Sequence, residues 1–272
     1  MNVTTRLTPG TRRAETMPLG MTPLAVVALG LLILPLVGLL ANTPWTRLGD
    51  LVTDQTVLAA LRLSLLTSLS ALALATVLGV PLAWLLARRD FPAKPLVRAL
   101  CVLPMVLPPV VGGVALLLAF GRRGLIGQPL HELAGITLPF SPAGVVLAET
   151  FVAMPFLVVT VEAGLRAMDR RYEDVAATLG AGRWLAFRRV TLPLLAPSLG
   201  AGMALCWARA LGEFGATITF AGNLTGRTQT MPLAVYLQLE RDLDSAILLS
   251  LILLAVSVVV LITLRGRYLD TS

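Results

Sequence analysis

Six long apolar runs, separated by short polar segments, constrain this chain more than any other feature. A helix needs about 20 predominantly apolar residues to cross the hydrocarbon core of a bilayer. Only 14% of the 272 residues are charged and 56% are hydrophobic, whereas a soluble domain carries about 25% charged residues. The sequence therefore predicts an all-α membrane protein with about six transmembrane helices. The predicted spans are Leu24–Ala41, Leu63–Leu86, Ala99–Phe120, Ala143–Val161, Leu194–Leu211 and Ala246–Leu264.

The positions of the arginines predict how these spans are oriented. Loops on the cytoplasmic side of a membrane carry an excess of Lys and Arg. With the N-terminus inside, the cytoplasmic segments hold most of the arginines, including a dense group between Arg166 and Arg189. Both termini are therefore predicted to be cytoplasmic, with residues 1–20 as a polar tail and residues 21–268 as a single transmembrane domain. The first run follows two arginines, as in a signal peptide, but it lacks a clear cleavage site and is predicted to remain as a span.

Residue types that would support chemistry of their own are scarce. His131 is the only histidine, which argues against a histidine-based metal site. The two cysteines, Cys101 and Cys206, lie inside apolar runs and are interpreted as small buried hydrophobic residues. Lys94, the only lysine, follows Pro-Ala instead of a glycine-rich loop, which excludes a Walker-type phosphate loop. We therefore expect no catalytic site, no metal and no cofactor on this chain, and any ATP to be bound by another chain.

The polar segment 166–193, between the fourth and fifth runs, has the most ordered pattern in the chain. Two acidic residues would begin a helix over Tyr172–Leu179, because acidic side chains stabilise the positive end of a helix dipole. Gly180-Ala181-Gly182 predicts a break, and a second, amphipathic helix is expected to follow and to end before Pro193. From the residues alone, two interpretations stand: an interfacial helix that lies on the inner leaflet, or a docking element for a soluble partner.

This segment resembles the EAA-type loop in membrane subunits of binding-protein-dependent ABC importers. The loop of that family has an acidic residue, two small residues, a glycine after three more, and later an apolar position followed by x-Leu-Pro. Asp174 stands where glutamate is usual, and Val175 stands where alanine is usual. The positions that match this spacing are Asp174, Val175, Ala176, Gly180, Val190, Leu192 and Pro193.

The resemblance implies that the loop docks in a cleft of a separate ATPase subunit and transmits its closure to the membrane helices. Docking of this kind would bury Ala176, and Gly180 would permit a close approach. It also implies the fold of a type I ABC importer permease. The residues expected to couple the chain to the ATPase are Glu173, Asp174, Ala176, Ala177, Gly180, Arg183, Leu192 and Pro193.

Two further stretches narrow the resemblance. Residues 103–113, LPMVLPPVVGG, begin the third span, and residues 211–223, LGEFGATITFAGN, follow the fifth, with TQTMPL at 228–233. Together they resemble the molybdate and tungstate permeases of ABC importers. Sulfate permeases are relatives that share the Gly-Glu-aromatic-Gly and Ala-Gly-Asn elements, whereas the TQTMPL stretch favours the molybdate type.

The same stretches are unusual for a helix that faces lipid. Their prolines remove backbone donors and kink or unwind a helix, and their paired glycines let a neighbouring helix pack closely. One interpretation is a close-packed, kinked bundle without substrate contact. The other is that these segments line the translocation path, where hydroxyls and backbone N–H groups suit a tetrahedral dianion that must also leave. The path residues of this second interpretation are Ser64, Pro108, Pro109, Gly112, Gly113, Glu213, Thr217, Thr219 and Asn223.

Charged residues inside the predicted spans are costly and need partners. Arg209 and Glu213 are four residues apart, so we expect them to pair on a continuing helix; the alternative is that they contact the anion. Glu149 lies well inside the fourth span, and Arg62 is a candidate partner that no sequence argument fixes. A proton-relay role for Glu149 would suggest an ion-coupled carrier, which the EAA-type loop opposes.

The residues and the resemblance together predict the permease subunit of an ATP-driven importer that moves molybdate, or tungstate, into the cytoplasm. The resemblance implies a homodimer in the bacterial inner membrane, two ATPase subunits that bind ATP and Mg, and an extracytoplasmic molybdate-binding protein, with no nucleic acid partner. A sulfate or thiosulfate permease is the alternative of the same type. An ion-coupled secondary carrier and a structural or regulatory membrane protein are alternatives of other classes, and the lack of an obvious inverted repeat argues against the carrier.

Overall fold

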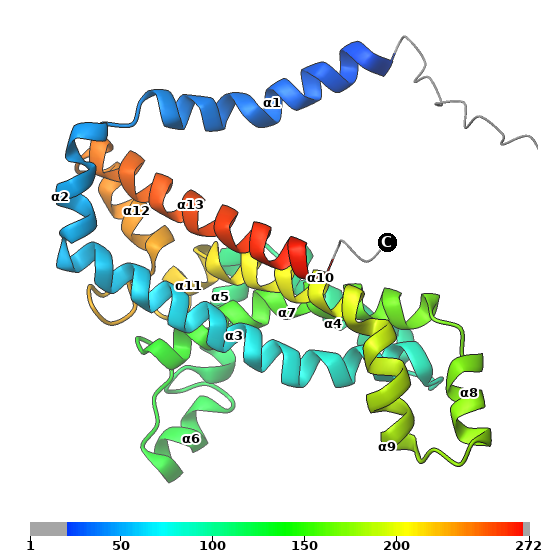
Figure 1. Ribbon diagram of the computed structural model, residues 1–272. Helices are drawn as coiled ribbons and strands as arrows, with labels where there is room; N and C mark the ends of the chain where they lie inside the picture. Colours follow the sequence, from blue (N-terminus) through cyan, green and yellow to red (C-terminus); the bar gives the residue numbers. More distant parts are fainter. Residues whose placement is uncertain (1–20, 269–272) are drawn as a thin grey trace, which may run out of the picture. The chain divides into compact units, whose positions relative to one another are not determined.

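The computed structural model describes residues 21–268, and all regular elements in that range are helical (Figure 1). The predicted N-terminal tail, residues 1–20, lies outside the described residues. The chain divides into two units, residues 1–43 and 44–272, and each is described by itself. In the first unit, α1 (Met21–Ala41) is apolar on every side and long enough to cross a membrane, as its sequence predicts.

The second unit holds the remaining helices. In the described range, four helical stretches of the chain are long and apolar enough to span a membrane: α1, α3, α7 and the continuous stretch α9–α10. The bent pair α4–α5 makes a fifth, and the described apolar part of α13, Leu243–Val259, is shorter. The elements of this unit are η1 (Trp45–Arg47), α2 (Leu48–Thr53), α3 (Gln55–Arg88), α4 (Lys94–Val106), α5 (Pro109–Phe120), α6 (Gly127–Ala134), α7 (Pro142–Ala167), α8 (Arg171–Thr178), α9 (Arg183–Ala186), η2 (Phe187–Thr191), α10 (Leu192–Leu211), α11 (Gly215–Phe220), α12 (Met231–Leu239) and α13 (Leu243–Tyr268).

The main core forms where α3, α7 and α10 pack together. On α3, small buried residues recur every four positions at Ala71, Ala75, Gly79 and Ala83. A Cβ atom on Gly79 would come within 3.1 Å of Val158 Cγ2 on α7. This stripe of small residues therefore lets the backbones of α3 and α7 approach closely, as helices do inside membranes.

The third predicted span is broken at its prolines. α4 ends at Val106, α5 begins at Pro109, and the two helices are bent by 119°. Pro108 and Pro109 have no N–H to donate to the preceding turn. Leu107 is extended, with ψ 135°, as expected for a residue that precedes proline. The predicted kink is confirmed, and the run 99–120 is not one straight helix.

Beyond this break, α5 packs closely on α11. A Cβ atom on Gly113 would lie 2.5 Å from Thr219 Cβ and 3.0 Å from the carbonyl oxygen of Ala216. A Cβ atom on Gly215 would lie 2.5 Å from Pro109 Cβ. Neither position has room for a side chain, so glycine is required for this approach of the two helices. The expectation that glycine allows close helix packing here is confirmed.

Candidate functional site

The segment between α7 and α10 forms a helical hairpin, with α8 followed by α9, at one end of the second unit (Figure 1). At the start of α8, Asp169 Oδ1 accepts the backbone N–H of Arg171 at 2.9 Å, which satisfies a donor that the helix itself leaves free. After α8, Gly180 adopts φ +79°, a conformation that glycine takes up without strain. The predicted helix over Tyr172–Leu179 and the break after it are confirmed.

The second helix of the hairpin continues into the core. α9 passes through a π-helical turn, η2, directly into α10, so the prediction that this helix ends before Pro193 is wrong. Proline lacks an N–H donor and crowds the preceding turn of an α-helix. In η2 the turn is wider, because the N–H of Leu192 reaches the carbonyl of Phe187, and the helix tolerates the proline that follows. The result is one helical rod over residues 183–211.

The outer side of the hairpin carries exposed apolar side chains. Leu179 is 81% exposed, Trp184 is 73% exposed, and Val175 is also exposed. The ring of Trp184 stacks on Phe187 with a centroid distance of 5.7 Å. Asp174 is exposed and has no side-chain partner among the residues that the structure describes. We call Asp174, Val175, Leu179 and Trp184 the loop face; exposed apolar surface of this kind is typical of a contact site for a partner or a membrane.

The inner side of the hairpin is already occupied by contacts within the chain. Ala176 is only 9% exposed, because α8 packs against η2 on this side; it is therefore already buried within the chain, and its burial by a docked partner stays a prediction. Glu173 Oε1 accepts hydrogen bonds from Arg88 Nη2 at 3.2 Å and from Thr191 Oγ1 at 2.9 Å. Of the other residues predicted to couple the chain to an ATPase, the exposed ones are Ala177, Gly180, Arg183 and Pro193, and the half-buried one is Leu192.

The structure brings part of the predicted path together at the contact between α5 and α11. Pro108 and Pro109 are exposed at the break, whereas Gly112 and Gly113 are buried. A Cβ atom added at Gly112 would contact an aromatic ring on α7, and a Cβ atom added at Gly113 would contact α11. Thr219 Oγ1 donates to the carbonyl of residue 215 in its own helix at 2.8 Å. These positions form a close-packed contact with the prolines at its exposed edge.

Of three other predicted path residues, Ser64 and Thr217 are buried and Asn223 is half-buried. Ser64 is 1% exposed, and its Oγ accepts the N–H of Met231 at 2.7 Å, which fixes the start of α12 against α3. Thr217 is fully buried, and its hydroxyl has no partner among the described residues. Asn223 Nδ2 donates to the carbonyl of Leu233 at 3.4 Å. In this structure, therefore, Ser64 and Thr217 are not exposed to a passage.

Glu149 on α7 is buried, with 2% exposure, and its Oε1 accepts a hydrogen bond from Thr67 Oγ1 at 2.9 Å. The partner is thus Thr67 on α3 instead of Arg62. The second oxygen, Oε2, has no hydrogen-bond partner in the described part of the chain. Ser64, Thr67 and Ser68 recur at helical spacing on the buried face of α3, and this pattern could have identified α3 as the source of the partner.

Arg209 and Glu213 form the ion pair that the sequence predicts, but not on a continuing helix, because α10 ends at Leu211. Arg209 Nη1 lies 2.6 Å from Glu213 Oε2, and the Glu213 side chain is 1% exposed. Glu213 Oε1 also accepts the N–H of Ala216 at 2.9 Å, so the same carboxylate stabilises the start of α11. Within the described residues, no three His, Cys, Asp or Glu side chains gather into a group that could hold a metal ion.

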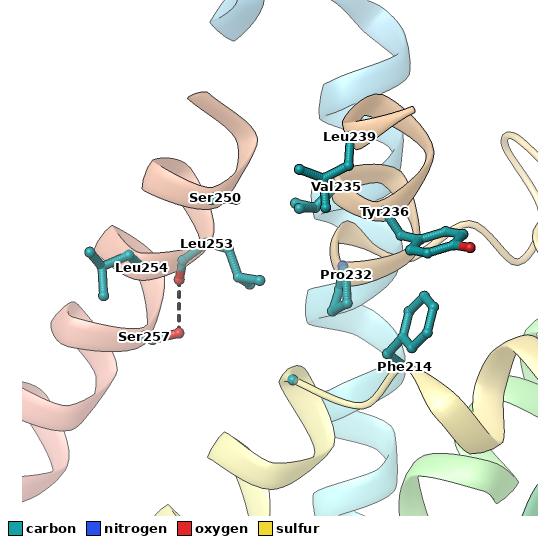
Figure 2. A pocket seen from close by; sticks show the side chains of 10 residues that line it. Phe214, Pro232, Val235, Tyr236, Leu239, Ser250, Leu253, Leu254 and Ser257 are labelled. Carbon is teal, nitrogen blue, oxygen red and sulfur yellow. Dashed lines mark hydrogen bonds between the residues drawn. The ribbon is translucent and has the colours of Figure 1, made fainter. Parts of the chain in front are cut away.

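An apolar hollow of about 480 Å³ lies between α12, α13 and the bend that follows α10 (Figure 2). Phe214 and Tyr236 line it, with ring centroids 5.1 Å apart. The hydroxyls of Ser250 and Ser257 also border it, but each donates at 2.8 Å to a carbonyl of its own helix. The hollow therefore presents few free donors, which makes it unsuited to an oxyanion.

Residues 79–272, a range that includes the hairpin, match the family described as "Binding-protein-dependent transport system inner membrane component". The chain belongs to this family. It is therefore a membrane subunit of a transporter and not an enzyme, as the sequence predicts.

The curated proteins that are similar to this chain include two kinds of permease. The molybdenum transport system permease protein ModB of Mycobacterium tuberculosis is 47% identical over 243 residues, which cover 89% of this chain and 92% of that protein. ModB of Escherichia coli is 47% identical over 182 residues, which cover 67% of this chain and 78% of that protein. The sulfate transport system permease protein CysT of Escherichia coli is 37% identical over 260 residues, which cover 93% of each chain.

A solved structure shares the arrangement of the helices. A bacterial ABC transporter involved in the import of the acidic polysaccharide alginate aligns with a TM-score of 0.75 at 16% identity, covering 93% of this chain and 96% of that chain. At this identity the likeness shows the fold alone. The expected fold of an ABC importer permease is confirmed.

Proposed function

We propose that this chain is the permease subunit of an ATP-driven importer that moves molybdate, or the similar anion tungstate, into the bacterial cytoplasm. The supporting observation is its 47% identity to the molybdenum permease of Mycobacterium tuberculosis over 89% of this chain. Identity to the sulfate permease of Escherichia coli is lower, at 37% over 93% of the chain, so a sulfate permease is the second candidate. In this proposal two copies form the translocation unit in the inner membrane, and an extracytoplasmic binding protein delivers the anion.

The loop face is the proposed contact with a cytoplasmic ATPase subunit. Leu179 and Trp184 expose large apolar surfaces, and burial of a large apolar side chain in a partner contributes about 1.5–3 kcal/mol. Asp174 adds a free charge that a basic side chain of the partner would pair. The ATPase would bind ATP and Mg, and this chain would need no cofactor. Because α9, η2 and α10 form one rod over residues 183–211, closure of the two ATPase subunits against the loop face would move α10 directly.

The interior suits brief passage of a dianion. Fixed cations along a path would hold such an anion too tightly for release. Arg209 lies in the region that the sequence assigns to the path, but Glu213 neutralises it at 2.6 Å. Other polar side chains proposed for the path, on Thr217, Thr219 and Asn223, are uncharged. Selection of molybdate against other anions is therefore assigned to the binding protein and not to this chain.

Uptake into proteoliposomes tests the proposal. The chain, its ATPase subunit and its binding protein would be reconstituted, and labelled molybdate would be supplied with sulfate as a competitor. ATP-dependent molybdate uptake that excess sulfate does not suppress is the expected result. Suppression by sulfate, with uptake of sulfate itself, would make the protein a sulfate permease. Accumulation without ATP on an imposed ion gradient would make it a secondary carrier.

The loop contact has its own test with a matched control. Leu179→Asp should prevent the ATPase subunit from co-purifying with the permease in detergent, because it places a charge on the apolar loop face. Leu133→Asp is the control, since Leu133 on α6 is equally exposed, at 88% against 81% for Leu179, but lies outside the hairpin. Retention of the ATPase by the Leu179→Asp variant would contradict the proposed contact.

A further inference from the structure

One carboxylate joins three elements at the end of the unit that bears the loop. Glu173 lies in the first turn of α8, and its Oε1 is bonded both to Arg88 at the end of α3 and to Thr191 in η2, at 3.2 and 2.9 Å. The three residues are far apart in sequence, by 85 positions in one bond and 18 in the other. We call Glu173, Arg88 and Thr191 the latch.

The latch is largely shielded from water. The side chain of Arg88 is 7% exposed, that of Glu173 is 28% exposed, and Thr191 is 2% exposed. The Nε atom of Arg88 has no partner among the described residues, so the carboxylate of Glu173 is the one charge that compensates this guanidinium in the described structure. Removing one member of a buried pair leaves the other charge uncompensated. Breaking the Arg88–Glu173 pair should therefore be strongly unfavourable in the intact protein.

Little else attaches α8 to the rest of the unit. Ala176 is the one buried residue of α8, and a single methyl group offers little apolar area. The loop face, by contrast, points outward and is free to bind a partner. The attachment of α8, which carries Asp174 and Val175, to α3 thus depends chiefly on Glu173, whereas Trp184 lies on the rod that continues into α10.

We infer that Glu173 is a positioning residue, which fixes the loop face to α3 and to the α10 rod so that the three move together. The inference rests on the proposed function, and it gives Glu173 a different role from the direct ATPase contact that the sequence suggests. A force applied at the loop face reaches α10 through the covalent rod, and α10 and α7 pack on α3. The Glu173–Arg88 pair adds the one direct ionic link from α8 to α3 in the described structure. Without the latch, α8 moves independently of α3, and ATP hydrolysis proceeds without an equivalent movement of α3.

The test measures ATPase activity and anion uptake in the same proteoliposomes of the full complex. Glu173→Gln and Arg88→Gln should each lower the ratio of anion transported to ATP hydrolysed about tenfold, the factor that corresponds to loss of a charged hydrogen bond of about 1.4 kcal/mol. ATP hydrolysis and binding of the ATPase subunit should remain. Arg89→Gln is the matched control, because Arg89 is the exposed neighbour without a partner in the described structure, and its ratio should equal that of the wild type.

A charge exchange separates positioning from simple loss of structure. The double variant Glu173→Arg with Arg88→Glu should recover most of the transport ratio that Glu173→Arg alone loses. If Glu173→Gln releases the ATPase subunit, as a substitution on the loop face would, Glu173 contacts the partner directly and the inference is wrong. A wild-type ratio in Glu173→Gln would also overturn it.

A second measurement does not depend on which anion is carried. A spin label at Ala177, an exposed position of α8, should become more mobile in Glu173→Gln and in Arg88→Gln, but not in Arg89→Gln, in the purified chain without partners. Unchanged mobility of the label in all three variants would contradict the proposed role of the latch, even if the wild-type complex transports the anion normally. If the wild-type complex shows no ATP-driven uptake while the label responds as expected, the proposed function fails and the latch stands.

Discussion

Gly180→Ala should weaken the contact with the ATPase subunit through the backbone alone. Gly180 adopts φ +79°, and no atom lies within 4 Å of the place where its Cβ would stand. Steric overlap is therefore absent, and the strain of an L-residue in the left-handed region, about 1–2 kcal/mol, is the whole effect. Strain of that size corresponds to an approximately 5- to 30-fold lower population of the native turn, so binding that requires this turn should weaken by the same factor.

Gly182 supplies a control two positions away in the same loop. It also has no atom within 4 Å of its Cβ position, but its φ of −63° and ψ of 159° are ordinary for any residue. The affinity of the purified ATPase subunit for the permease in lipid nanodiscs is the measurement. We expect the weakening in Gly180→Ala, none in Gly182→Ala, and partial recovery in Gly180→Asn, because asparagine tolerates the left-handed conformation better than alanine.

Two results would refute this reasoning. Equal weakening by Gly180→Ala and Gly182→Ala would mean that the partner touches the bare glycine surfaces, so that conformation is not the cause. Unchanged affinity in Gly180→Ala would mean that the left-handed turn is not needed for binding, and the loop face would then have to bind in another conformation.

Three more perturbations test other contacts. Hydrogen bonds from a serine and from Arg47 hold the pKa of Asp242 below its usual range; such a carboxylate stabilises the fold above the unfolded pKa and stops doing so as pH falls through the folded pKa. The small Tm difference between wild type and Asp242→Asn should thus be present at pH 7, begin to shrink near the ordinary carboxyl pKa of about 4, and vanish only below the lowered pKa of the folded state. Gly113→Ala should lower the free energy of unfolding in detergent by about 1–3 kcal/mol through overpacking against α11, and an unchanged stability would contradict the close contact. Thr67→Val should cost about 1–3 kcal/mol, because it leaves the buried Glu149 without its partner, whereas Thr67→Ser should not; equal stabilities of these two variants would contradict the bond.

Features that depend on neighbouring residues could be predicted from the sequence. The break after α4 follows from two adjacent prolines, and the break after α8 follows from a glycine that is free to take φ +79°. The Arg209–Glu213 pair follows from a spacing of four residues. In each case the physical cause lies within one turn of the residue concerned, so no knowledge of the packing is required.

Features that depend on how helices face one another could not be predicted. Thr67 and Glu149 are 82 residues apart, and Arg88 and Glu173 are 85 apart; their meeting depends on the rotation of α3 about its axis relative to α7 and α8. That rotation is set by the stripe of small residues on α3. The sequence does not show which helix packs against this stripe. The passage of a helix through Pro193 was missed for a related reason, since the π-helical turn that permits it differs from an α-helix in geometry and not in composition.

The end of the second unit that carries the α8–α9 hairpin differs from the middle of the unit in its charged contacts. By chain order, the end of α3, the start of α4, the end of α7 and the start of α10 all adjoin the hairpin or the short 89–93 link. There Glu162 of α7 binds Arg98 of α4 and Arg166 of its own helix, and the latch binds α8 to α3 and η2. Glu162 thus joins α4 to α7, Glu173 joins α8 to α3 and η2, and the packing of α3 on α7 connects the two groups. Farther along, α4 gives way to α5 at a bend of 119°, and α5 rests on α11 through glycine contacts without an ion pair between them in the described structure. A force on the loop face would therefore move these joined helix ends together. The movement would change the angle between α4 and α5 at the lowest free-energy cost, because backbone hydrogen bonds are already missing there.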